Sequence, residues 1–542
     1  MKRLGYILAA IATAIIFTVL FYEKSLGLNL VILEWVTIPI MMFLNRPLKV
    51  NKLTVTAIAA LLLTSLAVLY SHSGWTIFVN ILMFFTCNSI IVFKEYRSYM
   101  FAALESFRNA ALSFVPHINR KNKDGEPKMK KSKIFWLTIL AFGIAIHFVI
   151  LYSLASSKFE EMILNFLDLI NFKLIVLFIF GLVFANFVFR RKTEKLMTRE
   201  ADKKETIERK RKKRYFKGLS QAIKNRNFFG VILLGMLNIV LLLFNISDIR
   251  YVWFFTWDGS MLGEFIHQGV WILSFTIIIS QFITLLIFRG NLNFYSRNRL
   301  LKILAIIWLA QNCIMAISVC IRNIWYIKYF GLAFGRIEVF FFLALVIIGL
   351  ISTIIKISRR KTIYYLFKVN SYSFMVIISL SALINWDVAI ADYNFAHNKI
   401  DYSFMEGLDD PALPILTKTR EELDNIDKQK QQDKNYDPEY DYYYQNASIV
   451  YETNIKYKIK NFKERYENQS ILEWNYADQW AYRELDKKGF LEEDFLKVDY
   501  FETDIPDDLP SENEIGEDEV LDDSLNNALE QDSSDLDTAT HL

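Results

Sequence analysis

The chain changes character at one stretch, Asn385-Trp386-Asp387-Val388-Ala389-Ile390-Ala391-Asp392-Tyr393-Asn394. Up to residue 399 the sequence is apolar and basic, with 48 Lys and Arg against 20 Asp and Glu, a net charge of +28. From residue 400 to the end these counts are 14 and 38, a net charge of −24. We therefore interpret the stretch as the point where the chain leaves its last membrane-spanning helix.

The part of the chain before this stretch consists mostly of long apolar runs. A helix of about 18 or more apolar residues is long enough to cross roughly 30 Å of hydrocarbon. We find eleven such runs: residues 4–22, 28–44, 53–70, 75–93, 134–154, 170–189, 228–246, 270–288, 300–320, 337–355 and 372–390. The second and sixth are the weakest, because they carry Glu34 and Lys173. Eleven apolar helices cannot share one soluble core, so we predict an all-α polytopic membrane bundle of about 11 transmembrane helices.

The loops between these runs differ in charge from one side of the membrane to the other. If the amino terminus is cytoplasmic, the inner loops and that terminus hold 40 Lys and Arg, and the outer loops hold 8. Basic segments are translocated poorly, so cytoplasmic loops are rich in Lys and Arg. We therefore predict a multi-pass protein of the cell inner (cytoplasmic) membrane, with a cytoplasmic amino terminus and an extracytoplasmic carboxyl terminus.

Two of the cytoplasmic loops, residues 94–133 and 190–226, carry most of the basic residues. Such clusters attract anionic lipid headgroups by about 1 kcal/mol per charge, so we expect the bilayer itself as a partner. Nucleic acid is the alternative, but topology alone explains these charges, and we expect no nucleic-acid partner. The first loop also shows the pattern of an interfacial amphipathic helix over residues 96–115, with an apolar face of Leu104, Phe107, Ala111 and Phe114.

Helical patterning returns in the acidic half of the chain. Ser470 and Glu473 form a capping-box pattern, which is followed by an apolar face of Trp474, Ala477, Ala481 and Leu485. After Lys497 there are 16 acidic residues and no Lys or Arg, a composition that cannot bury a core. We divide the chain into a six-span membrane region with basic cytoplasmic loops (1–226), a five-span membrane region (227–399), a mostly helical extracytoplasmic tail domain (400–500) and an acidic disordered tail (501–542).

Motifs for catalysis or cofactor binding are absent from the sequence. The six histidines are scattered without metal-ligand spacing, and there is no phosphate-binding glycine loop, nucleophile elbow or kinase signature. The three cysteines, Cys87, Cys313 and Cys320, lie within predicted spans and form no Cys-x-x-Cys pair. We predict no catalytic residue, no cofactor and no metal site.

Polar residues gather at the outer ends of the last three predicted spans. Charges near hydrocarbon are costly unless they are paired or hydrated, so Arg322 or Arg336 should pair with Glu338 or Asp387. The spans end or begin at the same depth, and we predict one outer-face polar cluster of Arg322, Tyr326, Tyr329, Arg336, Glu338, Asn385, Asp387, Tyr393 and Asn394. Such a cluster either pins helix ends or, if an open cleft leads to it, binds a ligand.

The same residues carry a resemblance to a known family. The chain reads Arg322-(x3)-Tyr-(x2)-Tyr-x-Gly-Leu, then Asn385-x-Asp-(x4)-Asp-Tyr-Asn, and then Asp-Asp-Pro-Ala-Leu-Pro ending at Pro414. This combination resembles the bacterial membrane family called domain of unknown function 4173, with its close relative 4153. The family usually has Gly-Leu-Thr where this chain has Gly331-Leu332-Ala333. The resemblance implies a multispanning membrane protein and no particular activity.

Three classes of function fit these observations. The sizeable tail and the lack of catalytic motifs favour a non-enzymatic envelope protein that senses or scaffolds, with an envelope protein as the partner of its tail. A small-solute transporter is the second class, supported by the in-span polar residues Glu34, Asn80, Asn186, Asn238, Gln281, Gln311 and Asn312. The third is a membrane-embedded enzyme that would use Asp387, Asp392 or Asp401 beside the arginines.

Overall fold

The structure is a computed structural model. It describes residues 2–44, 51–92, 98–113, 172–189, 204–208, 217–254, 262–431 and 447–497, with short pieces between 140 and 162. The described residues up to Leu496 belong to one compact unit. The predicted disordered tail and about half of the fifth predicted span lie outside the described residues.

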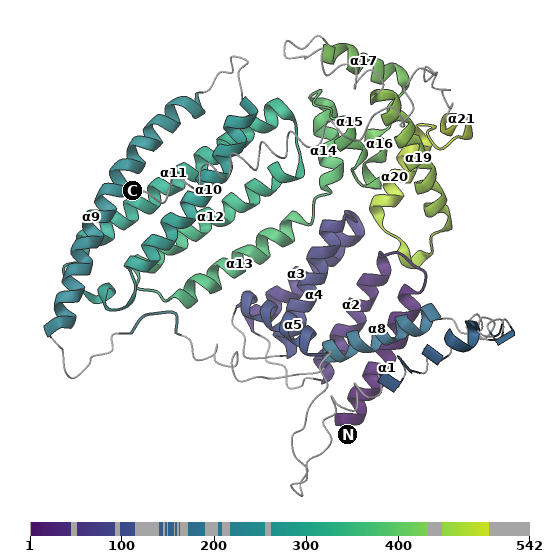
Figure 1. The fold of residues 1–542 in the computed structure, drawn as a ribbon, viewed down its shortest axis with the longest axis horizontal. Coiled ribbons are helices and arrows are strands. Elements are labelled where there is room, and N and C mark those ends of the chain that lie inside the picture. Colours follow the sequence, from purple (N-terminus) through teal and green to yellow (C-terminus); the bar gives the residue numbers. More distant parts are fainter. Residues whose placement is uncertain are drawn as a thin grey trace, which may run out of the picture. The chain divides into compact units, whose positions relative to one another are not determined.

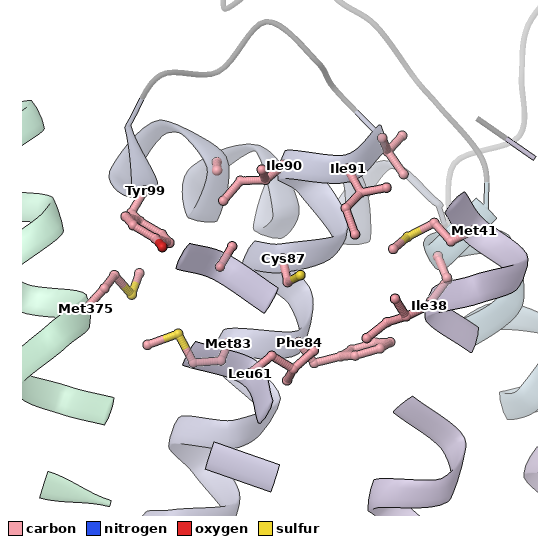
Figure 2. Close-up of a cluster of buried hydrophobic side chains, with 14 of the residues drawn as sticks. Ile38, Met41, Leu61, Met83, Phe84, Cys87, Ile90, Ile91, Tyr99 and Met375 are labelled. Atoms are coloured by element: carbon pink, nitrogen blue, oxygen red, sulfur yellow. The ribbon is translucent and has the colours of Figure 1, made fainter. Parts of the chain in front are cut away.

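The first group of helices comes from the amino-terminal half (Figure 1, purple to blue). It contains α1 (Lys2–Phe21), α2 (Leu28–Leu44), α3 (Lys52–Tyr70), α4 (Gly74–Val92), α5 (Tyr99–Ser113) and α8 (Phe172–Phe189). Their shared core is formed by apolar side chains that lie together in the bundle (Figure 2). Ile38 and Met41 enter it from α2, and Met83, Phe84 and Cys87 from α4.

The second group of helices follows in the sequence. It contains α9 (Lys217–Asp248), a π-helical turn (Ile249–Trp253), α10 (Leu262–Ile287), α11 (Arg299–Phe330), α12 (Phe334–Ser358) and α13 (Ile363–Ser381). Helix α11 packs against α9, α10 and α12. Helix α13 contacts α12 on one side and α3, α4 and α5 on the other, so it joins the two groups (Figure 1). Met375 of α13 lies in the core of the first group (Figure 2).

The helical, membrane-spanning character predicted from the sequence is confirmed. Eight of the described helices are long and apolar enough to span a membrane: α3, α4, α8, α9 with its π turn, α10, α11, α12 and α13. Helices α1 and α2 contain shorter apolar segments, Ile7–Phe21 and Leu28–Leu44. Apart from an isolated bridge between Thr206 and Lys361, the regular structure of the described residues is helical.

The bounds predicted for the last span, residues 372–390, are wrong. Helix α13 begins after Thr362, whose side chain accepts a hydrogen bond from the N–H of Tyr365, and it ends at Ser381. The side chain of Asn385 then accepts from the N–H of Val388 and starts a new helix, α14 (Trp386–Ala396). Apolar residues continue across this break, so hydropathy alone placed the span nine residues too late.

The described residues from 386 to 431 and from 447 to 496 form a helical unit that we call the C-terminal domain. After α14 it contains α15 (Tyr402–Glu406), α16 (Leu413–Leu416), α17 (Arg420–Gln431), α19 (Ala447–Asn468), α20 (Tyr476–Lys487) and α21 (Glu493–Leu496). Its core includes Ile455, Ile459 and Phe462 of α19, and Ala481 and Leu485 of α20. Of the predicted face, Ala477, Ala481 and Leu485 are buried on α20, whereas Trp474 lies before this helix, at the end of a 3-10 turn.

The predicted capping box is present, but it does more than start a helix. Ser470 and Glu473 bond reciprocally around a short 3-10 turn, Ile471–Glu473. Helix α20 begins later, after Asn475, whose side chain accepts from the N–H of Asp478. The Glu473 carboxylate also accepts bonds from the N–H and the hydroxyl of Ser25, at 2.8 and 3.0 Å. The turn thus touches the connection between α1 and α2.

The amphipathic helix predicted over residues 96–115 corresponds to α5. Leu104 and Phe107 of its predicted apolar face are exposed, as expected of side chains that face lipid. The opposite side is buried and includes Tyr99, Ala102 and Glu105.

Candidate functional site

The helix ends that meet the C-terminal domain define one side of the membrane, which we call the domain side. The residues of the predicted polar cluster lie at this side. Their contacts form three arrangements of hydrogen bonds, ion pairs and ring contacts.

The first arrangement is a buried ion pair between α9 and α11. The guanidinium of Arg322 pairs with the carboxylate of Asp248, and both side chains are buried, at 8% and 3% exposure. The hydroxyl of Ser318 also donates to Asp248, and the indole N–H of Trp253 donates to that hydroxyl at 3.2 Å. The partner predicted for Arg322 was Glu338 or Asp387, and Asp248 was not predicted. The sequence feature that could have indicated it is Asp248 itself, an acidic residue just after the seventh apolar run.

The second arrangement closes the turn between α11 and α12. Arg336 donates to the carbonyl groups of Phe330, at 2.7 Å, and Gly331, and its guanidinium lies 4.2 Å from the ring centroid of Tyr326. The amide of Asn323 donates to the backbone carbonyl of Arg336 at 2.8 Å. A cation suits this position, because the carbonyl end of a helix carries a partial negative charge.

The C-terminal domain docks on this same turn through Asn394. The side-chain oxygen of Asn394 accepts from the N–H of Leu332 at 2.6 Å, and its nitrogen donates to the Leu332 carbonyl at 2.9 Å. Gly331 permits the contact, because it has a φ of +82° and a Cβ there would lie 2.6 Å from the Asn394 oxygen. Two of the predicted cluster segments are therefore in direct contact.

The third arrangement connects α14 to the first group of helices. Asn385 donates to the carbonyl of Ser71, between α3 and α4, at 2.8 Å. Asp387 is buried and accepts from the N–H of Asp409 at 3.0 Å. The two remaining tyrosines of the predicted cluster lie against aromatic neighbours within their own helices: Tyr329 stacks on Trp325, and Tyr393 on His397.

A cavity of about 310 Å³ opens beside the third arrangement. It is lined by Ser73, Gly74, Trp75, Phe334, Ile337, Glu338, Phe341, Trp386, Asp387, Gly407 and Asp409. We call this cavity the mouth. A second cavity of about 670 Å³ shares Trp75, Glu338 and Phe341 with the mouth. The second cavity, which we call the groove, is lined by α4, α5, α12 and α13.

The mouth gathers three carboxyl groups: Glu338, Asp387 and Asp409. The side chain of Glu338 is exposed, and the described part of the chain provides it with no hydrogen bond or ion pair. Burial raises the pKa of Asp387, and so does the charge of Asp409, whereas the N–H of Asp409 and the charge of Lys458 act in the opposite direction. The mouth is therefore an acidic site in which one carboxyl group holds its proton more tightly than usual.

This raised pKa predicts a pH-dependent contribution to stability. Asp387 stabilises the fold most at a pH below the ordinary aspartate range, and that contribution is lost as the pH rises through its folded pKa. Asp387→Asn keeps the oxygen that accepts from Asp409 but cannot ionise. We expect its thermal midpoint to lie a few degrees above that of the wild type at pH 7.5, and this gap to narrow as the pH falls toward the ordinary aspartate pKa of about 3.9. A variant less stable than the wild type at pH 7.5 contradicts this expectation.

The in-span polar residues of the sequence analysis lie within the two helix groups. The carboxylate of Glu34 accepts from Ser65 at 2.9 Å and from the amide of Asn80 at 3.2 Å. In the second group, Gln281 donates to the Gly349 carbonyl and the Thr353 hydroxyl. Such bonds satisfy polar groups that hydrocarbon cannot hydrate. Within the described ranges no group of three or more His, Cys, Asp and Glu could hold a metal ion.

Comparison with known proteins identifies the family. No curated protein and no solved structure matches the chain. The model of one family, described as Domain of unknown function (DUF4153), matches residues 55–419. The motifs resemble family 4173, with 4153 as its close relative. The family that matches is 4153, so the expected kind of family is correct and the expected member is not. The match begins within α3, so it leaves out α1 and α2, and it covers the rest of both helix groups and the beginning of the C-terminal domain. This chain belongs to the DUF4153 family.

Proposed function

We propose that this protein is a non-enzymatic envelope protein, which senses or scaffolds by coupling its C-terminal domain to two groups of membrane helices. The observation that carries this proposal is that the domain contacts both groups. A domain fixed to only one group could not respond to a movement between them. A domain fixed to both must shift or strain when they move.

The contacts with the first group come from the turn that begins at Ser470. Its Glu473 accepts two hydrogen bonds from Ser25, and the carbonyl of Trp474 accepts from the N–H of Leu28 at 3.1 Å. The ring of Tyr476 stacks on that of Tyr70, with centroids 5.5 Å apart and planes 8° from parallel. These contacts connect the domain to α1, α2 and α3.

The contacts with the second group include the pair of hydrogen bonds between Asn394 and Leu332, together with ring contacts such as that of Phe341 with Trp386. Both bonds join one side chain to the backbone of the α11–α12 turn, so they hold the turn at a fixed orientation. The same turn is braced by Arg336, and α11 is tied to α9 by the ion pair of Arg322. A rotation of the second group would therefore move or strain α14 directly.

We place the domain side outside the cytoplasm, in the cell inner membrane of a bacterium. The charge of the loops supports this orientation, because up to residue 399 the amino terminus and the loops of the opposite side carry 40 Lys and Arg, and the loops of the domain side carry 8. Alkaline phosphatase fused after Leu416 should be active, and fused after Arg214 it should be inactive. The reverse pattern would overturn this orientation. Anionic lipids at the basic loops and an envelope protein at the domain are the partners we propose.

Complementation of a deletion strain under envelope stress tests the function. A scaffold needs its C-terminal domain, so a chain ending before residue 400 should fail to complement. Asp392 is exposed and is one of the acids that an enzyme would use. Asp392→Asn should therefore complement fully. Loss of complementation by this folded variant would favour the enzyme instead.

A further inference from the structure

We propose that the groove and its mouth bind one molecule of a phospholipid with a primary ammonium headgroup, such as phosphatidylethanolamine. An acyl chain would occupy the apolar groove, and the ammonium group would lie among the carboxylates and aromatic rings of the mouth. The two cavities share three lining residues, so one amphipathic molecule can occupy both.

The groove runs along the membrane part of the protein. At the domain side it begins at Trp75, near the start of α4, and at Ser381, the last residue of α13. It continues to Phe107 of α5 and Phe367, near the beginning of α13. Phe367 and Ser381 are 14 residues apart on α13, which at 1.5 Å per residue corresponds to about 21 Å. An acyl chain matches this length and polarity.

The mouth has the composition of an ammonium-binding site. Trp75 donates its indole N–H to the Ser381 hydroxyl at 3.0 Å, and Trp386 donates its indole N–H to the Ser381 carbonyl at 2.9 Å. Both polar edges are therefore satisfied, and these rings offer the cavity apolar and π surface. Cations are attracted to such surfaces, and Trp is the most effective ring.

Charge complementarity selects the headgroup. The mouth is lined by Glu338, Asp387 and Asp409, and no Lys or Arg is among its described lining residues. An anionic headgroup would be repelled there. A primary ammonium group has three hydrogen-bond donors, which can meet carboxylate oxygens, whereas a quaternary ammonium group has none. The site should therefore prefer ethanolamine over both glycerol and choline headgroups on the same acyl chains.

The test measures lipid retained by the full-length protein in native mass spectrometry. The purified protein is equilibrated with equal amounts of phosphatidylethanolamine, phosphatidylcholine and phosphatidylglycerol that carry identical acyl chains. We expect the ethanolamine lipid to be retained about tenfold more than either competitor, a ratio corresponding to about 1.4 kcal/mol. Equal retention of all three lipids, or retention of none, would overturn the proposal.

Two variants and a control separate the headgroup from the chain. Glu338→Gln removes an exposed, unpaired charge and should reduce the preference for ethanolamine severalfold. Leu345→Trp adds bulk to the groove and should reduce retention of all three lipids. Asp392→Asn changes an exposed acid of α14 that does not line the mouth, and it should leave retention unchanged. An unchanged preference in Glu338→Gln would overturn the assignment of the headgroup. Unchanged retention in a folded Leu345→Trp would overturn the assignment of the groove.

Discussion

Asp248→Asn is expected to be the most destabilising single substitution in the membrane part of the protein. The change leaves the guanidinium of Arg322 buried between α9 and α11 without its carboxylate. Removal of one partner of a buried pair costs about 3–5 kcal/mol, because the remaining charge stays buried. The amount of monodisperse protein and its thermal midpoint in detergent should both fall sharply.

A double substitution distinguishes the buried charge from a general loss of packing. Asp248→Leu with Arg322→Met removes both charges and keeps apolar volume at the site. Replacing a buried pair by apolar residues is often neutral or stabilising, so the double variant should recover most of the lost stability. An Asp248→Asn variant as stable as the wild type would show that the ion pair does not stabilise the packing of α9 against α11.

Gly27→Ala is expected to release the C-terminal domain from the first group of helices. A Cβ at this position would lie 2.2 Å from the carbonyl oxygen of Glu473 and 2.6 Å from its carbonyl carbon. These are backbone atoms, so the clash cannot be relieved by turning a side chain. Overpacking of this kind costs about 1–3 kcal/mol. That cost would shift a docking equilibrium by about 5- to 150-fold.

The readout for Gly27→Ala is a cross-link between the domain and α3. Cysteines replace Tyr70 and Tyr476, whose rings are stacked, in a chain in which Cys87, Cys313 and Cys320 are alanine. A short bifunctional maleimide joins the two cysteines, and the Gly27→Ala variant should lower the yield severalfold. Gly335→Ala is the matched control, because a Cβ there would meet nothing within 4 Å. An unchanged yield in Gly27→Ala would show that the turn at Glu473 does not seat the domain.

The sequence predicted the helices well because membrane helices are specified locally. Length and hydropathy decide whether a run of residues can cross the bilayer, and neither depends on distant parts of the chain. The end of α13 was misplaced for the same reason. Apolar residues continue through Trp386, whereas the break depends on one side chain, Asn385, which caps the next helix.

The contacts of the candidate site could be predicted only in part. Short segments near Arg322, Gly331 and Asp387 were assigned to one side of the bundle, because the direction of successive spans fixes the side of each loop. Pairing within that side depends on which helices are neighbours. Arg322 pairs with Asp248, which is 74 residues away in the sequence, because α11 packs on α9.

The groove could not be predicted from the sequence at all. Its lining residues belong to four helices, and Trp75 and Phe374 are separated by about three hundred residues. Each of them has an ordinary apolar environment in its own helix. The hydrogen bonds from Ser25 to Glu473 could not be predicted either, because a capping box is recognised by local spacing alone.

The central claim is that the C-terminal domain is seated on the membrane helices. The Tyr70→Cys and Tyr476→Cys pair tests this claim most directly when a protease site is inserted in residues 432–446, between the two cysteines. After cross-linking and cleavage, the account predicts that the two fragments remain joined and migrate as one band. Fragments that separate completely, although both cysteines have reacted with maleimide, would contradict it.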